Sequence, residues 1–82
     1  MVEVTEYWEK VSRAEKDRFG HFVVIKGEYE VRSRYMVNNT LAELKNRYRF
    51  RPNKFNIEDD RIVENNGTYF GIHSYTEIKE VA

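Results

Sequence analysis

The side chains best suited to chemistry lie in one basic run interleaved with aromatic rings. Cations neutralise phosphate groups, aromatic rings stack on unpaired bases, and an amide can hydrogen-bond a base edge. The run supplies all three kinds of group: Lys45, Arg47, Tyr48, Arg49, Phe50, Arg51, Asn53 and Lys54. On a helix, Lys45 and Arg49 would share one strip of surface, as would Arg47 and Arg51. The run therefore predicts a surface that binds RNA or single-stranded nucleic acid.

A purely structural interpretation of this run stays open. Tyr48 and Phe50 would then belong to the core, and the arginines would solvate a helix end, where the helix dipole favours cations. Against this interpretation, Glu43 is the only acid between Glu30 and Glu58, so few local carboxylates can neutralise the run.

Arg32 and Arg34 form a second basic candidate. As alternate residues of an expected strand they lie on one face, about 7 Å apart. If that face is exposed, the two arginines extend the predicted nucleic-acid-binding surface. The alternative is cross-strand pairing with acids, because Glu28 and Glu30 are expected on the same face.

The distribution of charge supports a basic surface, although the net charge is zero. Residues 1–25 carry a balance of −1, residues 26–54 a balance of +5, and residues 55–82 a balance of −4. A general-purpose basic nucleic-acid binder would have an excess of cations over the whole chain. The asymmetry between segments concerns partners rather than fold.

Catalytic and metal-binding patterns are weak. His21 and His73 lie 52 positions apart, outside any metal-ligand spacing, and the chain has no cysteine. No serine lies in a nucleophile elbow, and no glycine-rich phosphate loop is present. We therefore expect no metal, no cofactor and no enzymatic activity. A small endoribonuclease that uses His73 or His21 with arginines remains an alternative function, because such an enzyme needs only a base and positioned cations.

The elements expected to position these residues give an α+β fold in the order α-β-β-α-β-β-β, with a mainly antiparallel sheet and two helices. Glu6 to Arg18 is predicted to be an amphipathic helix, with Thr5 as N-cap and Gly20 as stop. Its apolar residues recur at spacings of three and four: Val4, Trp8, Val11 and Ala14.

A second helix is predicted from Leu41 to about Arg49, with Leu41, Leu44 and Tyr48 buried. Thr40 and Glu43 match a capping box, and Pro52 prevents the helix from continuing.

The remaining segments are predicted to be strands. His21 to Val37 is expected to be extended, with a hairpin turn favoured over a bulge at Lys26-Gly27-Glu28. Shorter strands are expected over Lys54 to Ile57, Arg61 to Glu64 and Thr68 to Ile78. Asn65-Asn66-Gly67 is predicted to be a hairpin turn, because Asn and Gly tolerate a positive φ, and Gly71 is predicted to be a bulge.

Length and composition bound the class of protein. Eighty-two residues predict one domain spanning residues 1–82. The absence of cysteine favours a reducing cytoplasm, because secreted domains of this size usually need disulfides. The N-terminal residues lack the apolar run of a signal peptide, and the longest apolar run, Phe22 to Ile25, is too short to cross a bilayer.

Together these observations predict a non-enzymatic protein that binds RNA, single-stranded nucleic acid or a ribonucleoprotein. The alternative is a protein–protein inhibitor or adaptor of a partner enzyme such as a nuclease. In dense charge, high Tyr and Asn content, absent Cys and small size the chain is similar to small phage accessory proteins that bind host factors. Twelve aromatic residues exceed what so small a core can hold, so a homodimer is a further possibility.

Overall fold

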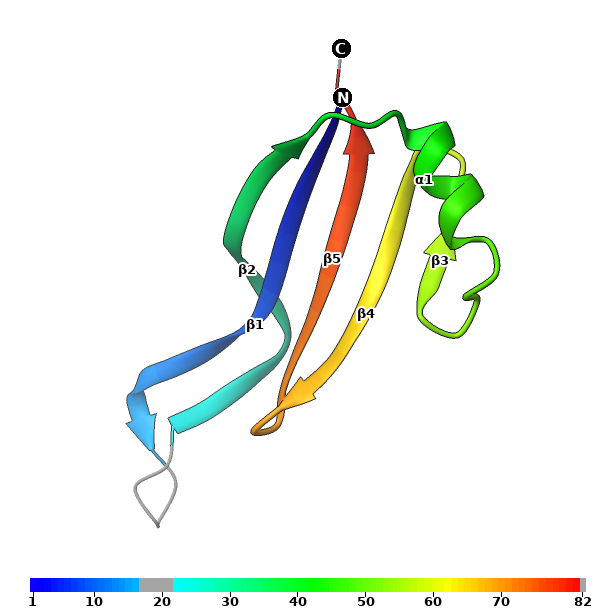
Figure 1. Ribbon diagram of the computed structural model, residues 1–82. Helices are drawn as coiled ribbons and strands as arrows, with labels where there is room; N and C mark the ends of the chain where they lie inside the picture. The colour runs from blue at the N-terminus through cyan, green and yellow to red at the C-terminus, as the bar shows by residue number, and fades with distance from the viewer. Residues whose placement is uncertain (17–21, 82) are drawn as a thin grey trace.

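The computed structural model describes residues 1–16 and 22–81, which form one antiparallel sheet and a helix (Figure 1). The elements are β1 (Val2–Lys16), β2 (Phe22–Val37), α1 (Leu41–Tyr48), β3 (Phe55–Ile57), β4 (Arg61–Tyr69) and β5 (Ile72–Glu80). The strand order in the sheet is β2-β1-β5-β4-β3. The α+β class and the antiparallel sheet are confirmed, but the described residues contain one helix rather than two.

The predicted helix over Glu6 to Arg18 is wrong, because these residues, as far as the structure describes them, belong to β1. Val4 and Trp8 are four residues apart, and this spacing places two side chains on the same face of a helix and also of a strand. Pairing decides between the two, since β1 is hydrogen-bonded to β2 on one side and to β5 on the other. Thr5 is not an N-cap but a 2 % exposed residue within the sheet. Gly20 lies outside the described residues.

The predicted hairpin at Lys26-Gly27-Glu28 is also wrong, and the bulge is the observed structure. In the pairing with β1, Tyr29 lies opposite Glu9 and Ile25 lies opposite Lys10, so the three intervening residues have no counterpart. Gly27 has a φ of 83°, a left-handed conformation that favours glycine. β2 therefore continues through this point as a single bulged strand.

α1 is confirmed, together with its N-cap Thr40. The Thr40 hydroxyl accepts a hydrogen bond from the Glu43 backbone N–H at 3.2 Å. A contact distant in sequence completes the cap, because the Glu80 carboxylate accepts from the Leu41 N–H at 3.0 Å. Leu41 and Leu44 are buried, and Tyr48 packs against the core.

The turn between β4 and β5 lies five residues beyond its predicted place. β4 runs through Asn65-Asn66-Gly67, of which Asn66 and Gly67 form a bulge, and the turn consists of Phe70 and Gly71. Both turn residues have positive φ, 51° and 78°, as a two-residue type I′ turn requires. A bulge and a tight turn select the same residue types, so the sequence signal did not distinguish the two structures.

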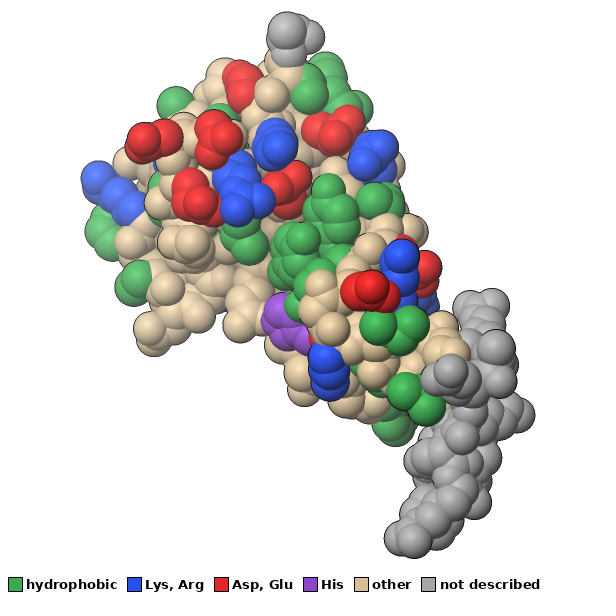
Figure 2. Space-filling model, turned by 180° about the vertical axis from the view of Figure 1, so that it is seen from behind, with side chains coloured by type: hydrophobic (Ala, Val, Ile, Leu, Met, Phe, Trp, Pro, Cys, Tyr) green, Lys and Arg blue, Asp and Glu red, His purple; other side chains and the backbone are tan. Residues whose placement is uncertain are grey.

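The hydrophobic core lies at one end of the sheet, beneath α1. It contains Val2, Val4, Leu41, Leu44, Phe55, Ile62 and Ile78, with Val37 and Tyr48 packed against it. We call the side of the sheet that carries Val4 and Ile78 the covered face, and the opposite side the open face. Figure 2 shows charged side chains gathered on one part of the open face, with hydrophobic side chains and a histidine beside them. In the described part of the chain no helix is long and apolar enough to cross a membrane.

Candidate nucleic-acid interface

The end of α1 and the loop that follows it hold most of the predicted basic run. We call residues 47–53 the arginine loop. Three backbone hydrogen bonds fold it back on itself: Arg51 N–H donates to the Tyr48 carbonyl at 3.0 Å, and the N–H groups of Lys54 and Phe55 donate to the Arg51 carbonyl at 3.1 and 3.0 Å. These bonds close the chain into successive turns and direct it into β3. The loop is therefore held in a defined conformation.

The two aromatic residues of the run have different environments. Tyr48 stacks on Phe55 with ring centroids 4.0 Å apart and belongs to the edge of the core. Phe50 is 75 % exposed, and the Arg49 guanidinium lies 4.6 Å from its ring centroid. The structural interpretation thus holds for Tyr48, whereas Phe50 presents a free ring face to solvent.

The cations of the run also divide into two groups. Lys45 donates to the Asp59 carbonyl at 2.6 Å, and Lys54 lies 3.4 Å from the Glu64 carboxylate. Arg47, Arg49 and Arg51 form no ion pair within 4 Å among the described residues. Arg51 and Asn53 are exposed. Three arginines, Phe50 and Asn53 therefore remain available on this loop.

Arg32 and Arg34 lie on β2, apart from the arginine loop. Arg34 is 3.6 Å from the Glu3 carboxylate, so an acid of β1 partly neutralises it. The Arg32 guanidinium lies 4.6 Å from the Trp8 ring centroid in a cation–π contact. The structure does not bring these two arginines together with the loop into one continuous patch.

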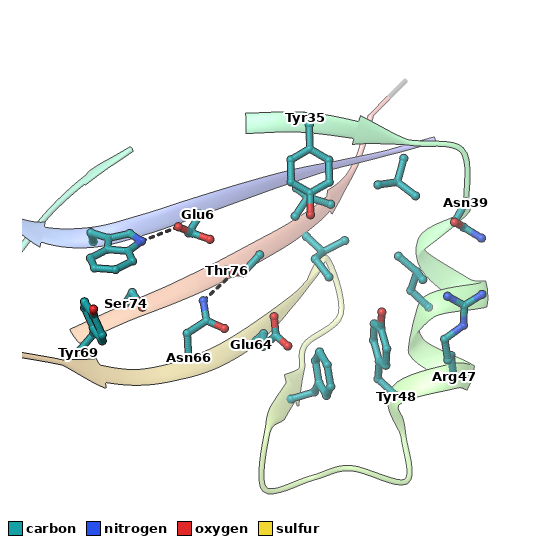
Figure 3. Close-up of a pocket in the computed structure, with 16 residues that line it drawn as sticks. Glu6, Tyr35, Asn39, Arg47, Tyr48, Glu64, Asn66, Tyr69, Ser74 and Thr76 are labelled. Carbon is teal, nitrogen blue, oxygen red and sulfur yellow. Dashed lines mark hydrogen bonds between the residues drawn. The ribbon is translucent and has the colours of Figure 1, made fainter. Parts of the chain in front are cut away.

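A groove on the covered face connects the two regions, and sequence reasoning missed it. Its volume is about 600 Å³, and both Trp8 and Arg47 line it. Figure 3 shows Arg47 on the helix side of the groove. Five aromatic rings contribute to its walls: Trp8, Tyr35, Tyr48, Phe55 and Tyr69. Arg32 adjoins the groove through Trp8, so cations lie near two separate parts of its wall. The alternation of residues along β1 and β5 is the sequence signal for this surface, but it required the correct assignment of β1.

Two hydrogen bonds join polar side chains of the groove to one another. The Trp8 indole N–H donates to the Glu6 carboxylate at 2.5 Å, and the Asn66 amide donates to the Thr76 hydroxyl at 2.8 Å (Figure 3). Glu6 and Glu64 place two carboxylates among the lining residues. Negative charge here disfavours phosphates inside the groove, while aromatic rings and amides suit planar, uncharged groups.

The predicted histidine candidate lies on the open face, in a hydrogen-bonded cluster. His73 Nδ1 is 2.8 Å from the Tyr29 hydroxyl, and its Nε2 is 3.0 Å from the Asn65 amide oxygen. Tyr75 contacts the rings of Tyr29 and His73. The pKa of Tyr75 is raised because burial disfavours the phenolate and Tyr7 stacks beside it.

Arg61 lines a shallow depression together with His73 and Tyr75. Its guanidinium is bound to the Glu77 and Glu58 carboxylates at 2.6 and 2.9 Å. Those two acids raise the pKa of Arg61 and occupy its guanidinium. His21 lies outside the described residues.

No family model matches this chain, and neither the curated proteins nor the solved structures include a significant match to it.

Proposed function

We propose that this chain is a non-enzymatic protein that binds RNA or single-stranded nucleic acid through the arginine loop. The observation that carries the proposal is the exposed ring of Phe50, stacked by Arg49 and flanked by arginines without ion pairs among the described residues. Guanidinium groups bind phosphates, and a base can stack on the free face of Phe50. Asn53 then lies close enough along the loop to hydrogen-bond a base edge.

The groove favours binding of single-stranded nucleic acid over binding of a duplex. Arg47 belongs to both the arginine loop and the groove wall. A nucleic-acid strand bound at the loop can therefore continue directly to the aromatic residues of the groove. Bases enter the groove, and the two carboxylates keep the phosphates outside it. Such an arrangement requires unpaired bases, because the bases of a duplex are already stacked on one another.

Fluorescence anisotropy with labelled RNA, single-stranded DNA and duplex DNA of one length tests the proposal. If Arg47, Arg49 and Arg51 neutralise about three phosphates, affinity should fall roughly 20-fold between 50 and 200 mM salt. Arg47→Glu with Arg51→Glu should weaken binding and flatten the salt dependence by one to two ion equivalents, about 0.7 per lost contact. Phe50→Leu should remove about 1–3 kcal/mol of stacking free energy and leave the salt slope unchanged.

A matched variant controls for net charge. Lys10→Glu with Lys79→Glu makes the same change in charge on two strands away from the loop, and we expect it to reduce affinity much less. Both lysines are exposed, so the fold should tolerate the change. Equal losses in the two double variants would mean that long-range charge, rather than the arginine loop, attracts the strand. The absence of binding to any oligonucleotide at low salt by the folded protein would overturn the proposal.

A second candidate function, an inhibitor or adaptor that binds a partner enzyme, is supported by the β4–β5 turn. Tyr69 and Phe70 are 64 % and 85 % exposed, and their rings contact each other edge to face. Aromatic residues on a protruding turn are typical anchors of protein–protein interfaces. If this function is the principal one, Phe70→Ser should abolish binding to a protein partner, whereas the double reversal at Arg47 and Arg51 should not.

The endoribonuclease alternative has a direct test. The His73 ring contacts the neutral side chains of Tyr29, Asn65 and Tyr75, and the nearby Arg61 is bound by two carboxylates. We therefore expect His73→Ala to retain nucleic-acid binding and to change only stability. Loss of an RNA-cleaving activity in folded His73→Ala protein would establish the alternative.

A further inference from the structure

β2 is an edge strand whose outer side has no neighbour among the described residues. It pairs with β1 alone, and it lies at the border of the sheet opposite β3 (Figure 1). β3 has three residues, whereas β2 has 16. Every residue from 30 to 36 is exposed. A long edge with unpaired backbone N–H and C=O groups is a template for another strand.

The exposed part of β2 is rich in apolar side chains. Val31, Tyr35 and Met36 are 47 %, 54 % and 47 % exposed. A second strand laid against this edge would remove part of their surface from water, a gain of about 25 cal/mol per Å². Backbone pairing and apolar burial therefore favour the same contact.

The order of charged residues along β2 favours a second copy of this chain as the strand that pairs with this edge. When an edge strand pairs with itself in an antiparallel manner, residues equally distant from the twofold axis lie opposite each other. With Val31 on the axis, Glu30 lies opposite Arg32 of the second copy, and Arg32 lies opposite Glu30. Charged side chains protect edge strands, and like charges directly opposite each other destabilise a strand pair. In this self-pairing, Glu30 of each copy lies opposite Arg32 of the other copy, so two pairs of opposite charge form.

The local structure places both charges on the same face, as such a pair requires. Glu30 lies opposite Trp8 in the register with β1, and the Arg32 guanidinium contacts the Trp8 ring. A register shift between Glu6 and Tyr7 leaves Arg32 as an extra residue of β2. The bulge interrupts the regular pairing with β1 at Arg32, directly beside the proposed axis, and bulges increase the local twist of a strand.

We propose that the chain forms a twofold-symmetric homodimer through the outer edge of β2, with Val31 on the axis and a Glu30–Arg32 pair on either side of it. The two sheets then join into one continuous sheet. The arginine loop follows α1 and lies apart from this edge, so the proposal stands or falls independently of nucleic-acid binding.

Sedimentation equilibrium from about 10 µM to about 1 mM protein tests the proposal, a range that spans weak to moderate dimers. The wild-type mass should rise with concentration to twice the chain mass of 9.9 kDa. Glu30→Arg and Arg32→Glu should each weaken the dimer at least about 100-fold, because each creates two like-charge contacts. The combined variant Glu30→Arg with Arg32→Glu should restore it, since exchange of the two charges preserves both pairs.

Mixing the two single variants gives the sharpest test. Each alone should be monomeric, but in the mixture all-basic and all-acidic edges face each other, so a heterodimer should form. Asp60→Arg, which makes the same charge change as Glu30→Arg on an exposed turn, is the matched control and should dimerise like the wild type. A monomeric wild-type chain at the highest concentration would overturn the proposal. So would a dimer that the single variants leave intact, or single variants that fail to pair when mixed while circular dichroism shows them folded.

Discussion

At the scale of single residues, Glu9 links three parts of the sheet. Its side chain is 5 % exposed and accepts hydrogen bonds from the His73 and Gly27 N–H groups at 2.9 and 3.0 Å, and from Lys26 at 3.3 Å. The backbone bond from His73 and then the bond from Gly27 lower the pKa of this carboxyl, and Lys26 contributes further. One carboxylate thus fixes the bulge of β2 and the start of β5 on β1.

Glu9 should make stability depend on pH in the acid range. Its pKa in the folded protein is lower than in the unfolded chain, where it is about 4.3. The stabilisation is therefore complete above that value and is lost as the pH falls through the folded pKa. We expect Glu9→Gln to lower stability at pH 7 and to flatten the acid limb in urea unfolding measured at several pH values. Glu28→Gln, on the exposed side of the same bulge, should retain the wild-type profile; identical profiles for both variants would contradict this role.

Phe70 is the residue with the clearest backbone strain. It is the one non-glycine residue of the described chain with a positive φ, 51°, and its ring is 85 % exposed. The left-handed region costs about 1–2 kcal/mol for most residues but less for Asn. Phe70→Asn should therefore raise the free energy of unfolding by up to about 1 kcal/mol, measured by urea titration. Phe50→Asn, at a comparably exposed ring without a positive φ, should give no such gain. Strain of this kind at an exposed aromatic turn is typical of a functional contact.

At the scale of elements, α1 depends on two caps from different sources. Thr40 caps the Glu43 N–H locally, and Glu80 caps the Leu41 N–H from β5. The Asn39 amide donates to the Glu43 carboxylate at 3.0 Å and, as the main cause, lowers its pKa. The start of the helix is therefore tied both to its own sequence and to the last strand.

Removal of the local cap should cost a defined amount. Thr40→Ala should lower the free energy of unfolding by about 1 kcal/mol, because one amide of the first turn loses its acceptor. Thr40→Ser keeps the hydroxyl and should remain within a few tenths of a kcal/mol of the wild type. Urea unfolding followed by circular dichroism measures both. An alanine variant as stable as the serine variant would mean that Glu80 alone holds the helix start.

At the scale of the whole molecule, the core lies at one end of a long, thin sheet. The molecule measures 48 × 26 × 16 Å, and the buried residues cluster beneath α1. β5 pairs with β1 only as far as Trp8, so β1 and β2 continue beyond that point as a two-stranded ribbon. Two-stranded ribbons are marginal in water, because they bury little surface.

This arrangement predicts a gradient of stability along β1. Amide hydrogen exchange should be slowest near Val2 and Val4, which lie between β2 and β5 and within the core. It should be faster at Lys10 and Val11, where only β2 is the partner. Exchange measured residue by residue with NMR will show the gradient. Uniform protection along β1 would mean that the ribbon unfolds only together with the core, or that a second molecule covers it.

The sequence by itself determined the features that depend on neighbouring residues. α1, its capping box and its end before Pro52 were all predicted, because each depends on interactions within a few positions. The same reasoning located the basic run and its interleaved rings. Gly27 and Gly71 were also recognised as irregular points of the chain, and both have a positive φ. Their roles were exchanged, because Gly27 lies in a bulge instead of a turn and Gly71 lies in a turn instead of a bulge.

Only the tertiary structure decided what depends on distant partners. β1 is a strand because β2 and β5 pair with both of its sides, which outweighs a spacing that fits either structure. The ion pairing of Lys54 and Arg34 was decided in the same way, since Glu64 and Glu3 engage them from other strands. The groove exists only once the sheet places its rings together. A local pattern defines what a segment can become, whereas contacts between segments far apart in the chain select one outcome.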